Sequence, residues 1–188
     1  MTFLEFYNAV LSTSIASYEE FLFPVKKRHF KKGEIITVYG QVEDSLYFIN
    51  NGIVEMTIKS YMSEKVIDFF FEKDFFCGLT SFLDQRPTDV QIVALMDCEV
   101  EVIRHKDLMQ AYEHSLDLNK FGRIMTEHGY IRKSNREKAL LTKTAEECYV
   151  EMFQDKPDYI FHIPVNKIAK YLGIHPESLS RIRKKIHS

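Results

Sequence analysis

The chain has 188 residues, of which 45% are hydrophobic and 28% charged, and its formal net charge is −2. These values are typical of a globular protein with one large or two small domains, and they exclude a chain that is disordered throughout. Taken as a total, the near-neutral charge argues mildly against a polyanionic partner.

Cysteine usage and the amino terminus indicate the compartment. Cys77, Cys98 and Cys148 are odd in number and widely spaced, so the sequence predicts neither a disulfide framework nor a metal site. Residues 1–6 contain no basic segment of a signal peptide, and no run reaches the ~18 apolar residues that a membrane span needs. We therefore expect a cytoplasmic protein without a membrane partner.

The charge is distributed unevenly along the chain. Residues 1–119 carry a net charge of −8, residues 120–161 carry +1, and residues 162–188 carry +5. This gradient indicates either a basic end that binds a polyanion or a solvated carboxyl-terminal helix, and charge alone does not distinguish the two.

The first 25 residues predict two short helices, one around Phe3–Leu11 and one around Phe21–Phe23 that ends at Pro24. From His29 to Arg104 the pattern changes to short β-rich runs. These runs are Ile35–Tyr39, Leu46–Ile49, Ile53–Ile58, Val66–Phe71, Gln91–Leu95 and Glu99–Ile103. Their spacing predicts an antiparallel sandwich or barrel, and Asn50-Asn51-Gly52 predicts a hairpin turn between two strands.

A long helix is predicted from Lys106 to about Lys138, since proline is absent and apolar side chains recur every three or four residues. These apolar residues are Leu118, Phe121, Ile124, Met125 and Ile131. Such a helix either folds back on the barrel or pairs with its copy in a second chain, and we favour dimerisation. Another helical stretch over 139–158 is expected to end at Lys156-Pro157-Asp158.

Residues 163–186 predict two helices joined by a tight turn. Ile168 and Leu172 lie one turn apart on the first helix, and Gly173 can adopt the left-handed conformation that ends it. Pro176 then starts a second helix, whose buried stripe begins at Leu179. This is the helix-turn-helix pattern, and the competing interpretation is a helical hairpin with a solvated basic face.

The exposed side of the second helix suits the major groove of DNA. Arginine can bind guanine through two hydrogen bonds, glutamate can accept one from cytosine, and lysine or serine can hold phosphates. The candidate DNA-binding residues are His175, Glu177, Ser178, Ser180, Arg181, Lys184 and Lys185.

The chain resembles the Crp/Fnr family of bacterial transcription regulators, which join a cyclic-nucleotide-binding-type barrel to a helix-turn-helix domain. The resemblance is carried by Lys32-Gly33-Glu34, Gly40 and residues 47–54 in the barrel, and by residues 168–174 and 177–184 at the carboxyl end. It covers nearly the whole chain, and the carboxyl-terminal match is closest to short Bacteroidetes-type members. It implies double-stranded DNA as partner, with Glu177 and Arg181 as base readers, and RNA polymerase as a further candidate partner.

The resemblance also implies an organisation. Residues 1–116 are expected to form the sensor barrel with its amino-terminal helices, 117–138 the dimerisation helix of a homodimer, and 139–188 the helix-turn-helix domain. The expected fold class is α+β, with an antiparallel β jelly-roll barrel and no carboxyl-terminal wing, because few residues follow Ile182. Two recognition helices of a dimer would read half-sites about 34 Å apart.

At the effector pocket that the resemblance implies, the residues of this chain differ from the family's usual residues. The corresponding residues are Phe76, Cys77, Gly78, Leu79, Thr88 and Asp89. Cys77 and Gly78 stand where the family has glycine and glutamate, and Thr88-Asp89 replaces its Arg-Ser pair. A carboxylate beside a phosphate is repulsive by at least ~1 kcal/mol even in water. We therefore predict no cofactor and no cyclic AMP binding of the usual kind, with another effector or none.

Other functions have less support in the sequence. A ligand-sensing module that acts through protein contacts is the main alternative, although the basic face over 177–185 is not needed for it. No nucleophile triad, phosphate loop or metal-ligand spacing indicates an enzyme, and Asp84 with Asp89 more plausibly holds solvated charges than an acid–base pair. His105, His114 and His128 are too dispersed for metal or haem ligation.

Overall fold

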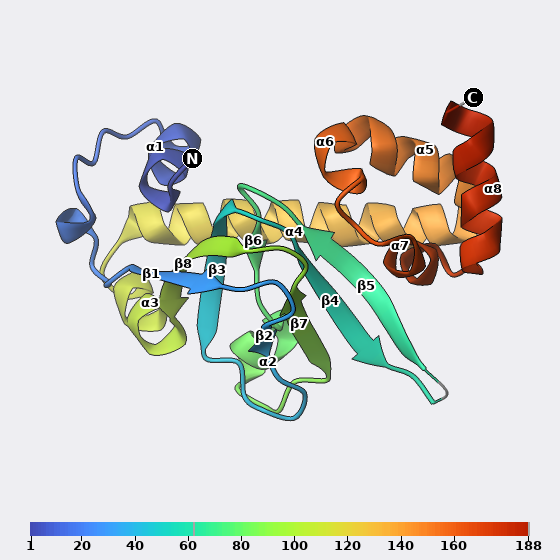
Figure 1. The fold of residues 1–188 in the computed structure, drawn as a ribbon. Helices are drawn as coiled ribbons and strands as arrows, with labels where there is room; N and C mark the ends of the chain where they lie inside the picture. Colours follow the sequence, from blue (N-terminus) through green and yellow to red (C-terminus); the bar gives the residue numbers. More distant parts are fainter. Residues whose placement is uncertain (62, 188) are drawn as a thin grey trace.

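The computed structural model describes residues 1–61 and 63–187, with side chains described to residue 186. The strands in this part of the chain are Lys26–Phe30 (β1), Ile35–Thr37 (β2), Ser45–Asn51 (β3), Val54–Lys59 (β4), Glu64–Phe70 (β5), Phe75–Phe76 (β6), Val90–Ala94 (β7) and Cys98–Arg104 (β8). They form two four-stranded antiparallel sheets, ordered β1-β8-β3-β6 and β2-β7-β4-β5. This is the predicted jelly roll (Figure 1).

The barrel core lies between the two sheets. Phe48 of β3, Ile92 of β7 and Val100 of β8 are completely buried there. Strand β7 alternates buried and half-buried residues, whereas β3, β4 and β8 bury consecutive residues, so short apolar runs rather than strict alternation made most of the strands predictable.

The predicted hairpin at Asn50-Asn51-Gly52 is wrong, because β3 and β4 belong to different sheets. The chain crosses between the sheets at Gly52, whose φ is 123°. A Cβ at this position would lie 2.5 Å from the Sγ of Cys98 and 2.9 Å from its Cα. The glycine is therefore required by a close approach to β8 as well as by its backbone conformation.

Two strands have no clear signal in the sequence. Strand β1 lies at the edge of its sheet, where β8 is its one partner among the described strands, and Lys26, Lys27, Arg28 and His29 are all exposed. Charged residues on an edge strand discourage pairing with other chains, but they also remove the alternation that identifies a strand. Strand β6 has only two residues.

At the amino end, helix α1 (Phe3–Leu11) is confirmed, and Thr2 and Glu5 form its capping box. The second predicted helix, around Phe21–Phe23, is wrong. Only a single 3₁₀ turn, η1 (Tyr18–Glu20), precedes this segment. Phe21 packs between Phe3 and Phe23, with ring centroids 5.3 Å from each, so its apolar pattern reflects an aromatic cluster rather than a helix.

The helix predicted to be continuous from Lys106 is interrupted. Helix α3 (His105–Tyr112) is followed by α4 (Leu116–Thr142), because Ser115 starts a new helix by accepting a hydrogen bond from the Leu118 amide at 3.2 Å. Helix α4 extends past the predicted end at Lys138. Leu140 and Leu141 therefore belong to α4 and not to the next helix.

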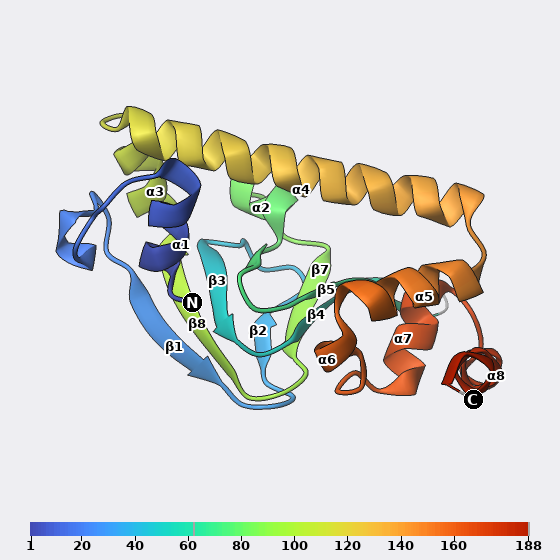
Figure 2. The ribbon, with the colours of Figure 1, turned by 90° about the horizontal axis from the view of Figure 1, so that it is seen from above.

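The carboxyl-terminal part is helical. Helix α5 (Ala145–Asp155) begins at a capping box of Thr144, and Pro157 starts the short α6 (Pro157–Ile160) instead of only ending the preceding helix. Helices α7 (Val165–Leu172) and α8 (Pro176–His187) complete the fold. Figure 2 shows α4 running along the molecule, with the barrel and α5–α8 on the same side of it. Within the described residues, no helix has the length and apolar character needed to cross a membrane.

Candidate nucleic-acid interface and effector cavity

Helices α7 and α8 have the geometry that the sequence predicts for a helix-turn-helix. Gly173 ends α7 with φ of 71°, and the amide of Ile174 donates to the Ala169 carbonyl at 3.0 Å. Ile168 and Leu179 are completely buried where the two helices pack. Ala169 is only 1% exposed, so a small residue lies at the closest part of this packing.

The predicted DNA-binding residues lie together at the start and on the outer side of α8. The exposed ones are His175, Glu177, Ser180, Arg181, Lys184 and Lys185, while Ser178 is half-buried. Ser180 donates its hydroxyl to the Pro176 carbonyl at 3.0 Å, so that hydroxyl is used within the helix. The exposed face therefore carries one carboxylate and several cations, a charge distribution that suits a polyanion.

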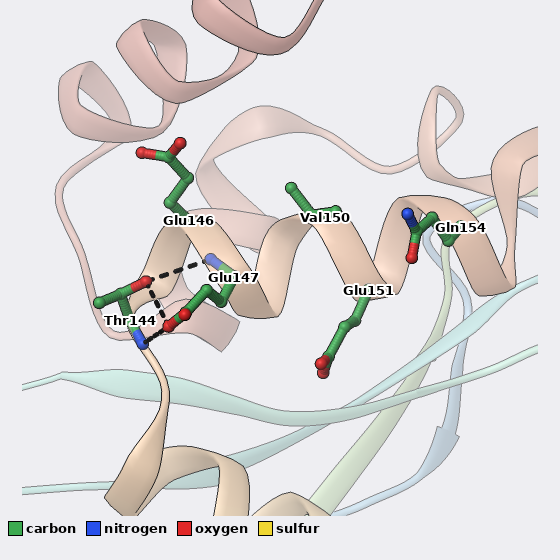
Figure 3. A pocket seen from close by; sticks show the side chains of 6 residues that line it. All are labelled: Thr144, Glu146, Glu147, Val150, Glu151 and Gln154. Atoms are coloured by element: carbon green, nitrogen blue, oxygen red, sulfur yellow. Dashed lines mark hydrogen bonds between the residues drawn. The ribbon is translucent and has the colours of Figure 1, made fainter.

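One of these cations is engaged by the neighbouring helix α5. The Nζ of Lys185 lies 2.6 Å from Oε1 of Glu146. Figure 3 shows Glu146 pointing toward the outer helices, whereas Glu151 points the opposite way, toward the strands. Thr144, Glu146, Glu147, Val150, Glu151 and Gln154 line a shallow depression here. Glu147 serves the cap of α5, because its carboxylate accepts from the Thr144 amide at 2.8 Å.

A second hollow runs between the barrel and α4, with a volume of about 1940 Å³. Helix α2 (Leu79–Asp84) contributes to its wall together with β4, β5 and β7. The apolar residues around it are Met56, Ile58, Phe70, Phe76, Cys77, Leu79, Leu83, Val90 and Met125. Burial raises the pKa of the Cys77 thiol, so this wall carries a neutral thiol at neutral pH.

The six predicted effector residues gather around the start of α2, but they do not all reach this cavity. Phe76, Cys77, Leu79 and Asp89 line it, whereas Gly78 and Thr88 are buried. Gly78 is packed so tightly that an added Cβ would lie 2.8 Å from Oγ1 of Thr88. Asp89 thus brings a carboxylate to the cavity.

A buried carboxylate that sequence reasoning missed lies behind this region. Glu43 is only 5% exposed, and it accepts hydrogen bonds from the Thr37 hydroxyl at 2.6 Å, the Ser45 amide at 3.2 Å and the Gly78 amide at 3.3 Å. Burial raises its pKa, and these hydrogen bonds oppose the rise. The Gly78 amide is thereby occupied by the protein's own carboxylate. In the sequence, the one feature that could have indicated this buried carboxylate is the turn Val42-Glu43-Asp44 between two strands.

The arginines that line the cavity are already paired. Arg123 binds Glu127 at 2.6 Å. Arg132 contacts Asp68 at 2.8 Å and Asp74 at 3.3 Å, and it also donates to the Phe69 carbonyl at 2.6 Å. Burial raises the pKa of Asp68, although Arg132 acts to lower it.

The third cavity arginine, Arg136, donates to the carbonyl of Tyr171. Among the described lining residues, each arginine therefore has a protein hydrogen-bond partner, and Arg123 and Arg132 are bound to carboxylates.

The apolar stripe predicted on the long helix is divided between two environments. Leu118 and Phe121 are 3% and 7% exposed and belong to the barrel core, with Met125 packed against it. At Leu118 and Phe121 the helix therefore folds back on the barrel, which is the alternative to the favoured partner-facing interpretation. Farther along α4, apolar side chains remain exposed, including Tyr130 (74%), Ile131 (54%), Leu140 (59%) and Leu141 (80%).

The cysteines and histidines have structural surroundings. Cys77 and Cys98 are buried, Cys148 is half-buried, and all are free thiols. His105 packs edge-on against Phe82, with ring centroids 4.9 Å apart. In the described part of the chain, no three His, Cys, Asp or Glu side chains are grouped closely enough to hold a metal ion.

Residues 27–115 match the family model for the cyclic nucleotide-binding domain, whereas no curated protein matches the sequence. The structure of FixK2 from Bradyrhizobium japonicum is 17% identical, with a TM-score of 0.76 over 87% of this chain and 85% of that chain. A protein described as a Crp/Fnr-family transcriptional regulator from Eubacterium rectale is 16% identical, with a TM-score of 0.69 over 94% and 84%. This is the Crp/Fnr fold.

A further neighbour with this fold is CLP from Xanthomonas campestris, described as a c-di-GMP-responsive global regulator. It is 17% identical, with a TM-score of 0.68 over 87% of this chain and 86% of that chain. The Crp/Fnr resemblance found in the barrel and helix-turn-helix motifs is thus confirmed as a likeness of fold. These neighbours are described as regulators rather than enzymes.

Proposed function

We propose that this protein is a homodimeric, sequence-specific DNA-binding transcriptional regulator. The observation that carries the proposal is α8, which begins at a tight turn, is buried on its Leu179 side and exposes Glu177 and Arg181 on the other. A helix of this kind fits the major groove, and residues near its amino end reach base edges. The net charge of +5 over residues 162–188 adds the attraction to phosphates that groove binding requires.

The test is selection of bound duplexes from a random DNA pool, followed by binding measurements with Arg181→Ala. Loss of a side chain that binds a base through two hydrogen bonds costs about 1–3 kcal/mol per half-site and relaxes the base preference there. Arg86→Ala is the matched control, because Arg86 is exposed on a barrel loop and the charge change is the same. Unaltered binding by Arg181→Ala would contradict the assignment of the recognition helix.

The second subunit is proposed to join along α4. Tyr130 and Leu141 are exposed on this helix and, being eleven residues apart, lie on the same side of it, where a partner helix would cover their apolar surface. A dimer would present two copies of α8 to half-sites about 34 Å apart. Sedimentation equilibrium of the parent and of Ile131→Glu tests this point, with a monomer expected for the variant.

The effector is proposed not to be cyclic AMP. Asp89 adds a carboxylate to the cavity, Glu43 occupies the Gly78 amide, and the described arginines of the cavity are paired with Glu127, Asp68, Asp74 and the Tyr171 carbonyl. The apolar wall around Phe76 and Met125 suits a less polar molecule. A different effector, or regulation without one, is consistent with this chemistry.

The alternative is a sensing module that acts through protein contacts, and RNA polymerase stays a candidate partner under either proposal. The two functions differ in salt dependence. DNA binding weakens steeply with salt because phosphate contacts release counterions. A protein that selects no duplex and shows no salt-dependent DNA binding would favour the sensing module.

A further inference from the structure

Helix α7 is attached to the barrel by a buried ion pair. The Nζ of Lys167 donates to Oε1 of Glu55, which lies on β4 and is separated from it by 112 positions in the sequence. The Glu55 side chain is 3% exposed and that of Lys167 is 24% exposed. A charge pair this well shielded is screened little by salt, so it can hold a defined geometry.

This ion pair is poorly explained as a source of stability. The second oxygen of the Glu55 carboxylate, Oε2, is buried and has no hydrogen-bond partner among the described residues. Removing two charges from water is costly, and the attraction offsets this cost only when the remaining lone pairs are satisfied. A half-satisfied pair contributes little to folding, but it specifies where α7 sits.

A second contact reinforces the first, one helical turn along α7. The ring of Tyr171 lies 5.3 Å from that of Phe69 on β5, and the guanidinium of Arg136 lies 3.8 Å from the Tyr171 centroid. Arg136 belongs to α4 and also donates to the Tyr171 carbonyl. Residues four apart share a helix face, so Lys167 and Tyr171 attach one face of α7 to both the barrel and α4.

The adjacent face of α7 carries α8. Ile168, Ala169 and Leu172 are buried in the cluster that contains Leu179. Helix α7 therefore lies between the barrel and the recognition helix. Apolar barrel residues, among them Ile53 and Phe69, pack in the same cluster, and the Glu55–Lys167 pair adds a directional polar contact to this packing. Alternation along β4 places Met56 on the opposite side, in the effector cavity, so strand β4 contacts both the cavity and α7.

We propose that Glu55 and Lys167 are positioning residues for sequence-specific DNA binding. They hold α7 so that α8 enters the major groove at the spacing set by the α8 of the second subunit. This inference rests on the proposed function. A helix-turn-helix released from the barrel would still carry the same base-reading and phosphate-binding side chains. It would have to be ordered at each half-site during binding, and that lost preorganisation weakens specific recognition.

The experiment measures three quantities for the parent and for Glu55→Gln: affinity for the selected operator, affinity for random duplex, and the salt dependence of both. We expect operator affinity to fall about tenfold, with random-duplex affinity and the salt slope unchanged, because phosphate contacts remain. Hydrogen exchange without DNA should show reduced protection of α7. Glu99→Gln removes one carboxylate from β8 of the other sheet and should match the parent in each measurement.

Two further variants separate positioning from other roles. Glu55→Gln/Lys167→Met should lose no more affinity than Glu55→Gln alone, since both act through one contact. A larger loss with a smaller salt slope would mean that Lys167 binds phosphate, and it would overturn the proposal. Arg136→Lys keeps the charge but loses the planar stacking on Tyr171, so it should repeat the loss of operator affinity if Glu55→Gln does not fold.

Unchanged or tighter operator binding by folded Glu55→Gln overturns the positioning role. A parent protein that binds no duplex refutes the proposed function instead. The two failures are therefore distinguished by the parent alone.

Discussion

Neutralising Glu146 should strengthen DNA binding. Its carboxylate holds Lys185 at 2.6 Å, with the two side chains 40% and 71% exposed, so DNA must compete for this lysine. A surface ion pair of this kind contributes about 0.5 kcal/mol. A dimer on two half-sites would no longer have to break two such pairs, so the binding free energy of Glu146→Gln should improve by about 1 kcal/mol, which corresponds to roughly fivefold tighter binding. Removing a negative charge near the phosphates acts in the same direction.

Fluorescence anisotropy with a selected operator duplex, at several salt concentrations, measures this gain. The matched control is Glu151→Gln on the same helix. Glu151 pairs with Lys143 at 2.5 Å and points away from α8 (Figure 3), so its neutralisation should leave affinity unchanged. Weaker or equal binding by Glu146→Gln would refute the competition. An equal gain in both variants would refute it too, because overall charge would then explain the effect.

Three further predictions concern Gly52, the cysteines and the cavity. Gly52→Ala should lower the free energy of unfolding by about 2–3 kcal/mol in urea denaturation, because its Cβ would collide with Cys98; a loss below ~0.5 kcal/mol would contradict this. Burial raises the pKa of the Cys77 and Cys98 thiols, which disfavours the reactive thiolate form of both. Iodoacetamide at pH 8 should therefore label half-buried Cys148 first, as followed by mass spectrometry. Equal labelling rates at the three cysteines would contradict this prediction. Calorimetry with cyclic AMP should show no micromolar binding, since Asp89 lines the cavity; measurable heats at that concentration would overturn the prediction.

Local signals predicted the helix-turn-helix well. Gly173 ends α7 and Pro176 starts α8 as their conformational preferences require, and Leu179 is buried as the apolar spacing indicates. Capping and periodicity depend on residues within one or two turns, so they can be read from a single sequence. The break before Leu116 shows the limit. A serine cap interrupted an apolar pattern that otherwise continues.

Strand pairing was beyond the reach of such signals. Asn51-Gly52 has the residue types of a hairpin turn, yet it crosses between sheets, because pairing depends on which distant strands are adjacent. The same limit applies to Leu118 and Phe121. Their spacing identifies an apolar helix face, but only the packed barrel decides that this face is covered within the chain.

Local composition and periodicity predicted most of the elements, the helix-turn-helix and the concentration of positive charge at the carboxyl end, and the family resemblance added the jelly-roll class. Tertiary structure alone decided that Glu43 takes the Gly78 amide, that the cavity arginines are paired, and that Glu55 meets Lys167. Each of these contacts joins residues far apart in the chain. Polar side chains carry no periodic mark of their partners, so only the folded arrangement shows which charges are buried together.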